Sequence, residues 1–220
     1  MQDEMGLALR LAPPTFGPMM TDEKRHAPAT LRNRQPLLDA LHPHLPQTGL
    51  LLEIASGSGE HAVFLAENLP ALTFQPSDPD EDARASIRAW AAESGLPNLR
   101  PPLPLDAARP DAWPNVRPDA ILCVNMIHIA PWDAAIGLFT GAGRLLQPGA
   151  PLCLYGPYKR GGQHTSDSNA AFDADLKARN PAWGVRDLEA VMDLAAANGL
   201  TGPDIIQMPA NNLTVIFRRT

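Results

Sequence analysis

Apolar positions along the chain fall into short continuous runs that alternate with longer stretches of helical spacing. Four runs predict buried strands at residues 50–54, 72–75, 120–127 and 151–155. Helical spacing predicts helices at residues 29–45, 60–69, 80–94, 134–146, 170–178 and 185–198. A weaker run at 99–105 is interrupted by prolines and predicts a strand near a sheet edge. Two final runs, 205–208 and 213–218, predict a terminal hairpin.

The alternation of strands and helices favours right-handed βαβ units and a mostly parallel sheet with helices on both faces. With the weak run included, we expect a Rossmann-like α/β fold. Its sheet has seven strands, of which the last two form a C-terminal antiparallel hairpin. Residues 25–220 are interpreted as a single domain, because 45% of the chain is hydrophobic and can form a core. Residues 1–24 show no clear period and are interpreted as a flexible N-terminal arm or a lid.

Composition narrows the classes of partner. The net charge of −6 disfavours nucleic acid, whose non-specific binding relies on Lys and Arg. No apolar run reaches the roughly 18 residues of a membrane-spanning helix and no signal peptide is evident, so we expect no membrane partner and a cytoplasmic location. Cys123 and Cys153 lie in apolar runs typical of buried strands. Neither a disulfide nor a metal site is therefore expected.

The strongest local signal is a glycine-containing turn directly after the first predicted strand. Such a turn lets the backbone approach a nucleotide at the carboxyl end of the strand. Dinucleotide sites usually read G-x-G-x-x-G, whereas here the spacing is Ala-x-Gly-x-Gly with an acid in front. That acid, Glu53, would repel a pyrophosphate but suits the cationic amino group of S-adenosylmethionine. The predicted cofactor contacts in this turn are Glu53, Ala55, Ser56, Gly57 and Gly59.

The first position of the turn and the function of the whole motif each need a separate interpretation. Ala55 stands where the methyltransferase pattern acid-x-Gly-x-Gly-x-Gly has its first glycine, so we expect an unstrained backbone at this position. A tight strand–helix turn that binds no ligand is the alternative interpretation of the whole motif.

Further acids follow the next two predicted strands. Asp78 lies 19 residues beyond Gly59, near the spacing of about 20 residues at which an acid binds ribose hydroxyls. Asp80 and Glu81 are close neighbours that instead fit helix capping. Asp106 follows the third predicted strand and is a candidate for the adenine amino group. A capping or solvated aspartate is its alternative interpretation.

Candidate residues for the substrate side follow the fourth and fifth strands. Asn125 is expected near the cofactor, Met126 near the substrate, and His128 has an ordinary pKa suited to a general base. A structural histidine is the alternative. Tyr155 and Tyr158 are predicted to act at the catalytic centre.

Charged and amide side chains elsewhere are further candidates for substrate contact. Arg160 and His164 lie on the glycine-rich loop after the fifth strand, where they could attract an anionic substrate or remain solvated. Asn211 and Asn212 suit either the hairpin turn or a substrate. Arg32 and Asn33 follow the segment 25–28. Together these residues could fold over the cofactor or form the basic face of the first helix.

The sequence resembles a functionally unassigned family of methyltransferase-like proteins found in bacteria and animals. The resemblance runs from about Arg25 to Arg218. It rests on the strings RN at 32–33, EIASGSGEH at 53–61, NMIHI at 125–129, YGPY at 155–158, SNAAFD at 168–173, WGVRD at 183–187 and PANNL at 209–213. The resemblance implies a class I methyltransferase fold and S-adenosylmethionine as cofactor. It implies no substrate.

The function expected from sequence is that of an S-adenosylmethionine-dependent methyltransferase. Its acceptor is expected to be a small polar or anionic molecule, and the protein a monomer or homodimer. One alternative is a non-catalytic protein that binds S-adenosylmethionine or S-adenosylhomocysteine and acts through partners. The other is a nicotinamide-dependent oxidoreductase with a degenerate Rossmann loop.

Overall fold

The computed structural model describes residues 24–220, so the N-terminal arm or lid expected at 1–24 lies, except for its last residue, outside the described residues. A six-stranded sheet has the order β2-β1-β3-β4-β8-β7. Its strands are β1 (Gly49–Ile54), β2 (Leu72–Pro76), β3 (Ala120–Val124), β4 (Pro151–Pro157), β7 (Leu200–Met208) and β8 (Asn212–Arg219). The first four are parallel, and β8 pairs antiparallel with both β4 and β7.

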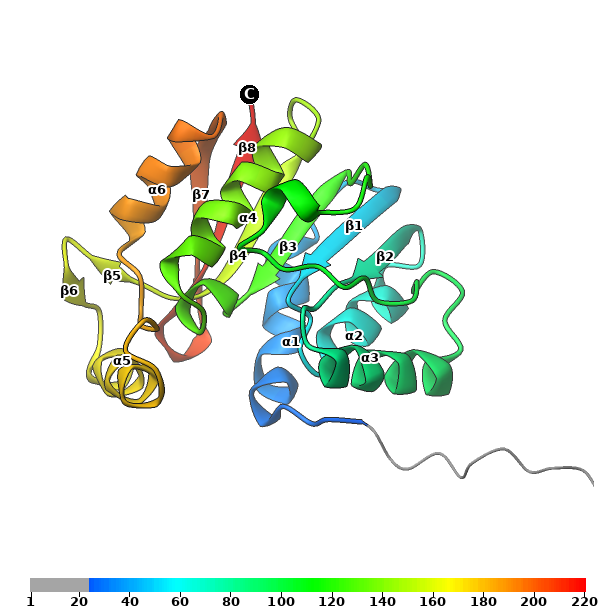
Figure 1. Cartoon of the computed structure of the whole chain (residues 1–220), viewed down its shortest axis with the longest axis horizontal. Coiled ribbons are helices and arrows are strands. Elements are labelled where there is room, and N and C mark those ends of the chain that lie inside the picture. The colour runs from blue at the N-terminus through cyan, green and yellow to red at the C-terminus, as the bar shows by residue number, and fades with distance from the viewer. Residues whose placement is uncertain (1–23) are drawn as a thin grey trace, which may run out of the picture.

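Helices cover both faces of the sheet, as expected (Figure 1). They are α1 (Pro28–Leu41), α2 (Glu60–Asn68), α3 (Glu81–Ser94), α4 (Trp132–Leu145), α5 (Asp167–Arg179) and α6 (Leu188–Ala197). In Figure 1, α4 lies in front of the sheet and α1 behind it. None of these helices is long and apolar enough to cross a membrane, a statement limited to residues 24–220.

The sheet separates two hydrophobic cores because successive strand residues point to opposite faces. In β1, Leu52 packs in the core that also holds Phe139 of α4 and Val191 of α6. Its neighbour Leu51 packs in the other core, with Leu37 of α1. Both leucines are fully buried. The continuous apolar run therefore reflects a strand covered on both sides, which is typical of parallel sheets.

The prediction of seven strands was wrong, because the segment 99–105 forms no strand. It runs beside β2 at the sheet edge, where Leu99 and Leu103 make isolated bridges to Phe74 and Ser77. The prolines 101, 102 and 104 have no N–H group to donate, so a regular ladder cannot continue. The expected position near an edge is correct, but the expected ladder is not present.

The strand predicted at 120–127 ends earlier, at Val124. Asn125 adopts a left-handed conformation with φ of 61°, and the one-turn 3-10 helix η2 (Met126–His128) follows. This turn directs the chain back beneath the end of β4. The terminal hairpin is confirmed, with left-handed Ala210 and Asn211 in the one-turn η3 (Pro209–Asn211) between its strands. A short hairpin of β5 (Lys159–Arg160) and β6 (Gln163–His164) was not expected from the sequence.

Candidate functional site

The glycine turn lies at the carboxyl end of β1 and leads directly into α2. Gly57 and Gly59 have φ values of 57° and 93°, which favour glycine. A Cβ atom at Gly59 would lie 2.9 Å from the Cα atom of Ile87 in α3, so this glycine also allows close packing of the turn against α3. A Cβ atom at Gly57 would meet no atom within 4 Å. The turn thus packs tightly on one side and is open at Gly57.

The expectation of an unstrained backbone at Ala55 was wrong, because this residue is left-handed with φ of 56°. The turn requires this conformation whichever residue occupies the position. Alanine was expected to avoid strain here, but its Cβ atom crowds the backbone in the left-handed region, which costs about 1–2 kcal/mol.

We therefore expect the substitution Ala55→Gly to raise the free energy of unfolding by about 0.5–1 kcal/mol, because relief of the strain exceeds the added flexibility of the unfolded chain. Urea denaturation measures this difference. Ala174→Gly, exposed in the middle of α5, is the control and should lower stability by about 1 kcal/mol. A loss of stability in Ala55→Gly would contradict the argument.

Glu53 places a buried carboxylate at the end of β1, directly before the turn. Its side chain is 2% exposed, and Oε2 has no hydrogen-bond partner among residues 24–220. Burial raises the pKa of Glu53 to about 7, a rise that Ser56 opposes and the charge of Asp78 reinforces. A buried acceptor without a partner is unfavourable, so the site is suited to a cationic or hydrogen-bonding group.

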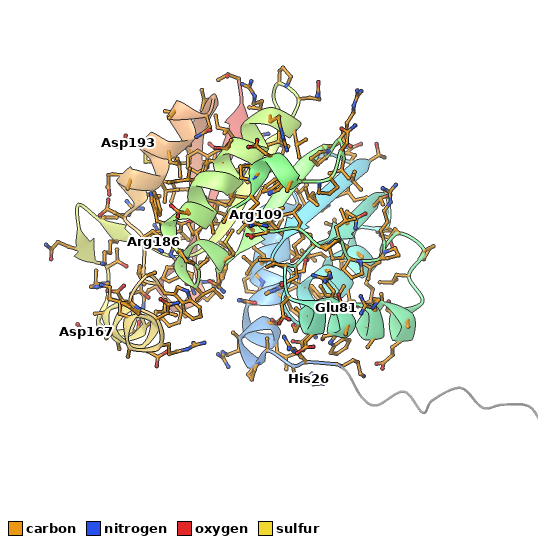
Figure 2. All side chains as sticks on the ribbon, in the orientation of Figure 1. His26, Glu81, Arg109, Asp167, Arg186 and Asp193 are labelled. Atoms are coloured by element: carbon orange, nitrogen blue, oxygen red, sulfur yellow. The ribbon has the colours of Figure 1, made fainter. Side chains whose placement is uncertain are left out.

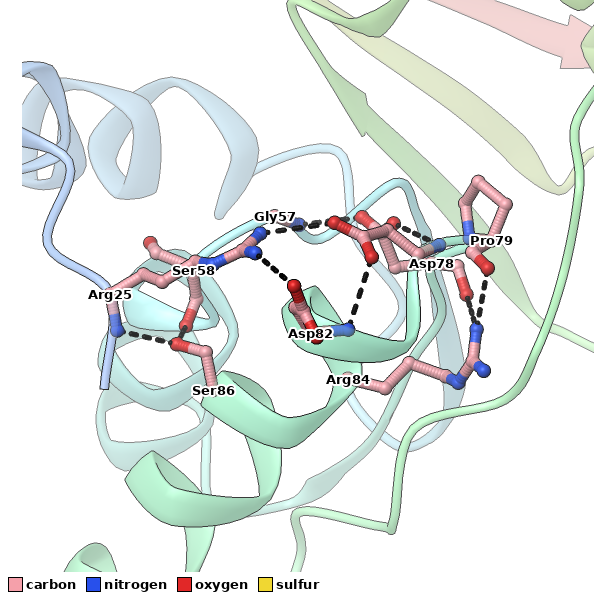
Figure 3. Close-up of polar contacts among 9 residues, drawn as sticks. Arg25, Gly57, Ser58, Asp78, Pro79, Asp82, Arg84 and Ser86 are labelled. Atoms are coloured by element: carbon pink, nitrogen blue, oxygen red, sulfur yellow. Dashed lines mark hydrogen bonds and ion pairs between the residues drawn. The ribbon is translucent and has the colours of Figure 1, made fainter. Parts of the chain in front are cut away.

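Asp78 connects the glycine turn with the loop after β2 (Figure 3). Its Oδ2 accepts a hydrogen bond from Gly57 N at 3.0 Å, and its Oδ1 accepts one from Asp80 N at 3.0 Å. Burial raises the pKa of Asp78, and these two backbone hydrogen bonds oppose the rise. Asp80 itself caps α3 by accepting from Asp82 N. The structure therefore brings Glu53, the turn and Asp78 together, as expected.

The segment 24–27 runs along α3 and reaches the N-terminal end of α2. Arg25 N donates to Ser86 Oγ at 2.8 Å, and Ser86 Oγ donates to Ser58 O at 2.7 Å within the turn (Figure 3). The Arg25 guanidinium contacts Asp80 and Asp82. Its neighbour His26 contacts Glu60 at the start of α2 and lies on the same side of the molecule as Glu81 of α3 (Figure 2). The chain before α1 is thereby fixed against the outer side of the glycine turn.

A pocket of about 250 Å³ lies at the carboxyl ends of β3 and β4. It is lined by Ala29, Asn33, Asn125, Tyr155, Pro157, Ser168, Asn169, Phe172, Ala210 and Asn212. Four of the predicted site residues therefore share one cavity, although they come from distant parts of the sequence: Asn33, Asn125, Tyr155 and Asn212. Sequence reasoning did not single out Ser168, Asn169 or Phe172 as site residues. They occurred only within the string that carries the family resemblance.

Within this pocket, Asn33 and Asn212 flank Tyr155. Burial raises the pKa of the Tyr155 hydroxyl, while hydrogen bonding from the side chains of Asn33 and Asn212 lowers it. His61 of α2 lies behind Asn33, with Nε2 at 2.8 Å from its Oδ1. An amide oxygen only accepts, so His61 Nε2 carries the hydrogen. His61 was missed from the sequence, and it links the helix after the glycine turn to this pocket.

His128 and Tyr158 do not line the pocket. Both are buried, with their rings edge to face at 5.0 Å, and His128 Nε2 and Tyr158 Oη have no partner among residues 24–220. A Cβ atom on Gly156 would lie 2.6 Å from His128 Nε2, so the ring packs directly against this backbone. Burial lowers the pKa of His128 to about 3, helped by the charge of Arg186, and burial raises the pKa of Tyr158.

Arg186 links the His128 turn to the segment that precedes α6. Its backbone N donates to His128 Nδ1, and its guanidinium donates to the carbonyl oxygens of Ile127 and Ala130. Figure 2 shows Arg186 beside the start of α4. Met126 of η2 is buried in the core on this side.

The remaining predicted residues do not line the pocket, but Asn211 adjoins it, because its Nδ2 donates to Ser168 Oγ at 3.2 Å. Arg32 is exposed on α1, Arg160 is exposed on β5, and His164 Nε2 contacts Asp173 at 3.3 Å. Asn211 occupies the left-handed turn, where its carbonyl oxygen accepts from Asn169 Nδ2. Asp106 is exposed, and its Oδ1 accepts from Ala108 N, which fits the capping interpretation. Within residues 24–220, no group of three or more His, Cys, Asp or Glu side chains is placed to hold a metal ion.

Solved structures with this arrangement of elements include several methyltransferases. An O-methyltransferase family protein from Burkholderia thailandensis has a TM-score of 0.75 at 16% identity over 87% of this chain and 57% of that chain. The S-adenosylmethionine-dependent methyltransferase SibL has a TM-score of 0.72 at 20% identity, over 87% of this chain and 55% of that chain. Human N-acetylserotonin methyltransferase, solved with S-adenosylmethionine, has a TM-score of 0.72 at 11% identity, over 87% of this chain and 52% of that chain.

This chain spans little more than half the length of these proteins, and the likeness establishes the fold. The expected α/β methyltransferase fold is therefore confirmed. A family model with the description "Protein of unknown function (DUF938)" matches residues 24–219. That range agrees with the span over which the sequence resembles an unassigned methyltransferase-like family. The chain therefore belongs to the DUF938 family of proteins of unknown function.

Proposed function

We propose that this protein binds S-adenosylmethionine at the glycine turn and methylates a small molecule in the adjoining 250 Å³ pocket. In this proposal Glu53 binds the amino group of the cofactor and Asp78 its ribose hydroxyls. Ala55, Ser56, Gly57 and Gly59 supply the turn, and Asp106 remains a prediction for the adenine. When bound, the cofactor supplies an activated methyl group, and the chain contributes mainly by placing the acceptor beside it.

One observation carries the proposal: directly beside the glycine turn, the buried Glu53 carboxylate has an oxygen without a hydrogen-bond partner among the residues that the structure describes, 24–220. A cationic amino group would pair with this oxygen and compensate for its burial. A pyrophosphate would instead bring negative charge next to Glu53 and Asp78, which the geometry places at the same turn. The two acids therefore favour an adenosyl amino acid over a dinucleotide.

The acceptor side of the proposal rests on the pocket at the ends of β3 and β4. Asn125 and Tyr155 line it, so both are proposed to contact the acceptor. His128 and Tyr158 are buried behind Gly156, and we assign them the role of holding Asn125 and the end of β4 in position. Direct methyl transfer to an uncharged atom with a free lone pair, such as a neutral nitrogen, needs no base before the transfer, so a buried His128 is compatible with catalysis.

Thermal denaturation with added ligands tests the proposal. S-adenosylhomocysteine at 100 times its dissociation constant should stabilise the protein by about 2.7 kcal/mol, and NAD should not. Stabilisation by NAD alone would replace the proposal with the oxidoreductase alternative. Binding of S-adenosylhomocysteine without turnover of S-adenosylmethionine on a broad set of acceptors would favour the non-catalytic alternative.

The raised pKa of Glu53 leads to a prediction about ligand affinity. If the ionised carboxylate binds the amino group, S-adenosylhomocysteine affinity should fall about tenfold for each pH unit below 7, because the carboxyl must first lose its proton. Isothermal titration calorimetry between pH 5.5 and 8, in two buffers of different ionisation enthalpy, measures both affinity and proton release.

The variant Glu53→Gln separates this carboxyl from Asp78, whose pKa is raised as well. It should bind more weakly at pH 8 and lose most of the pH dependence. A Glu53→Gln protein that keeps the wild-type pH dependence would assign the titration to another group.

A further inference from the structure

The polar side chains of the 250 Å³ pocket are all uncharged. They are Asn33, Asn125, Tyr155, Ser168, Asn169 and Asn212. The rest of the lining is apolar, and Phe172 is the largest apolar side chain in it. A charged ligand that entered this pocket would lose water without gaining an opposite charge, which is costly. The lining therefore matches a neutral molecule that has hydrogen-bonding groups and an apolar face.

Hydrogen bonds inside the protein determine which amide atoms remain for a ligand. Asn169 Nδ2 donates to Thr165 Oγ1 at 3.0 Å and to Asn211 O at 2.9 Å, which leaves its Oδ1 to accept. Asn212 Nδ2 donates to Pro209 O at 3.2 Å, which leaves the Oδ1 of Asn212 to accept from a ligand as well. The Oδ1 of Asn33 is engaged by His61, so its NH₂ group remains on the side of Tyr155. The pocket thus has both donors and acceptors, held in fixed orientations.

Cationic side chains near the pocket are engaged elsewhere. The carboxylate of Asp173 is 4% exposed and lies 2.6 Å from Lys177 Nζ, 3.3 Å from His164 Nε2 and 3.5 Å from Lys159 Nζ. Asp173 therefore pairs with Lys177 and Lys159 and offsets one of their two positive charges. On the α1 side, the Arg34 guanidinium lies over the Phe64 ring at 4.7 Å. Among residues 24–220, no Lys, Arg or His side chain lines the pocket, so an anionic substrate bound there would not contact an opposite charge from the chain.

We infer that the acceptor bound in this pocket is a small uncharged molecule with hydrogen-bonding groups and an apolar face, and not an anion. This inference rests on the proposed function and narrows the expectation of a polar or anionic acceptor. The pocket volume of about 250 Å³ lies below the 300–1,000 Å³ of sites for drug-sized ligands, so the occupant is correspondingly small.

A screen of matched fragment pairs tests this substrate class. Pairs such as benzamide and benzoate, or nicotinamide and nicotinate, have nearly the same shape and differ in charge. Each fragment is titrated into the full chain with S-adenosylhomocysteine present, and binding is followed by ligand-observed NMR. A pocket ligand is defined as one whose binding is lost in Ala29→Trp, because Ala29 lines the pocket and a tryptophan would fill it.

We expect the pocket ligands to be neutral members of the pairs, with the anionic members at least tenfold weaker. The variant Ser168→Lys places a cation on the lining and should strengthen the anionic members. Asp175→Lys, exposed on α5 outside the lining, is the matched control and should not change the preference.

Equal or tighter binding of the anionic members to the wild-type protein would overturn the inference, as would a screen with no pocket ligand of either charge. Failure of the proposed function has a different signature. In that case S-adenosylhomocysteine itself does not stabilise the protein, whatever the fragments do.

Discussion

Replacing Asp78 with asparagine is expected to weaken S-adenosylhomocysteine binding by about 30-fold or more. In the proposed complex the carboxylate accepts from the ribose hydroxyls while its two oxygens keep their bonds to Gly57 N and Asp80 N. Hydrogen bonds to a charged acceptor contribute about 1.5–3 kcal/mol each, and about 2 kcal/mol corresponds to 30-fold in affinity. The neutral amide has one acceptor atom, so it also holds the glycine turn less well.

Isothermal titration calorimetry measures this loss, and circular dichroism checks that the variant is folded. Asp82→Asn is the matched control. Asp82 lies four residues away and is exposed, and it pairs with Arg25 without contacting the turn. Its affinity should stay within about twofold of wild type. Equal affinity of Asp78→Asn and the wild-type protein would remove Asp78 from the cofactor site.

The free energy of unfolding is expected to fall by about 3 kcal/mol between pH 6.5 and 4.5. Burial lowers the pKa of His61 to about 4 and that of His128 to about 3. Over this interval the unfolded chain protonates both histidines and the folded chain does not, so each makes stability rise with pH. Glu53 acts in the opposite sense, because its folded pKa of about 7 makes the native state hold a proton that the unfolded state has lost. The net difference is about one proton, or about 1.4 kcal/mol per pH unit.

Urea denaturation at half-unit steps of pH gives this slope directly. Below pH 4.5 Glu53 takes up its proton in the unfolded chain as well, while His61 begins to titrate in the folded protein. The two changes offset each other, so the slope should stay near one proton and then decrease as His128 titrates. In His61→Gln the slope between pH 6.5 and 4.5 should fall to near zero, since one histidine then balances Glu53. A wild-type stability that does not change with pH would show that the two histidines are not buried in neutral form.

The glycine turn and its acids could be predicted because they depend on local sequence. A parallel strand must end before a turn that positions α2, so Glu53 and Gly59 are placed by the spacing of the motif itself. Asp78 followed from the regular alternation of strand and helix, which brings the ends of β1 and β2 to one edge of the sheet. These contacts span only two adjacent strands.

The pocket could not be predicted because it depends on packing between distant elements. Asn33 comes from α1, Asn169 from α5 and Asn212 from the terminal hairpin. No sequence spacing shows that these three amides meet around Tyr155. His128 was misleading for a related reason. A histidine near a strand end is a natural candidate base, but the left-handed turn at Asn125 carries it beneath Gly156.

Ala55 and the segment 99–105 show two limits of reasoning from residue preference. The backbone preference of alanine predicted an unstrained conformation at Ala55, whereas the folded turn holds this residue in the left-handed conformation. For the segment 99–105, residue preferences correctly predicted a position at the sheet edge. They did not predict that its three prolines prevent a regular strand ladder.

The strand β1, which lies between β2 and β3, is packed from both faces of the sheet. Leu51 and Leu52 anchor separate cores, and both belong to the same strand that ends at Glu53. A packing defect on either face displaces the same few backbone atoms before the glycine turn. A substitution in either core, far from the glycine turn, can thus shift the turn through the strand that leads into it.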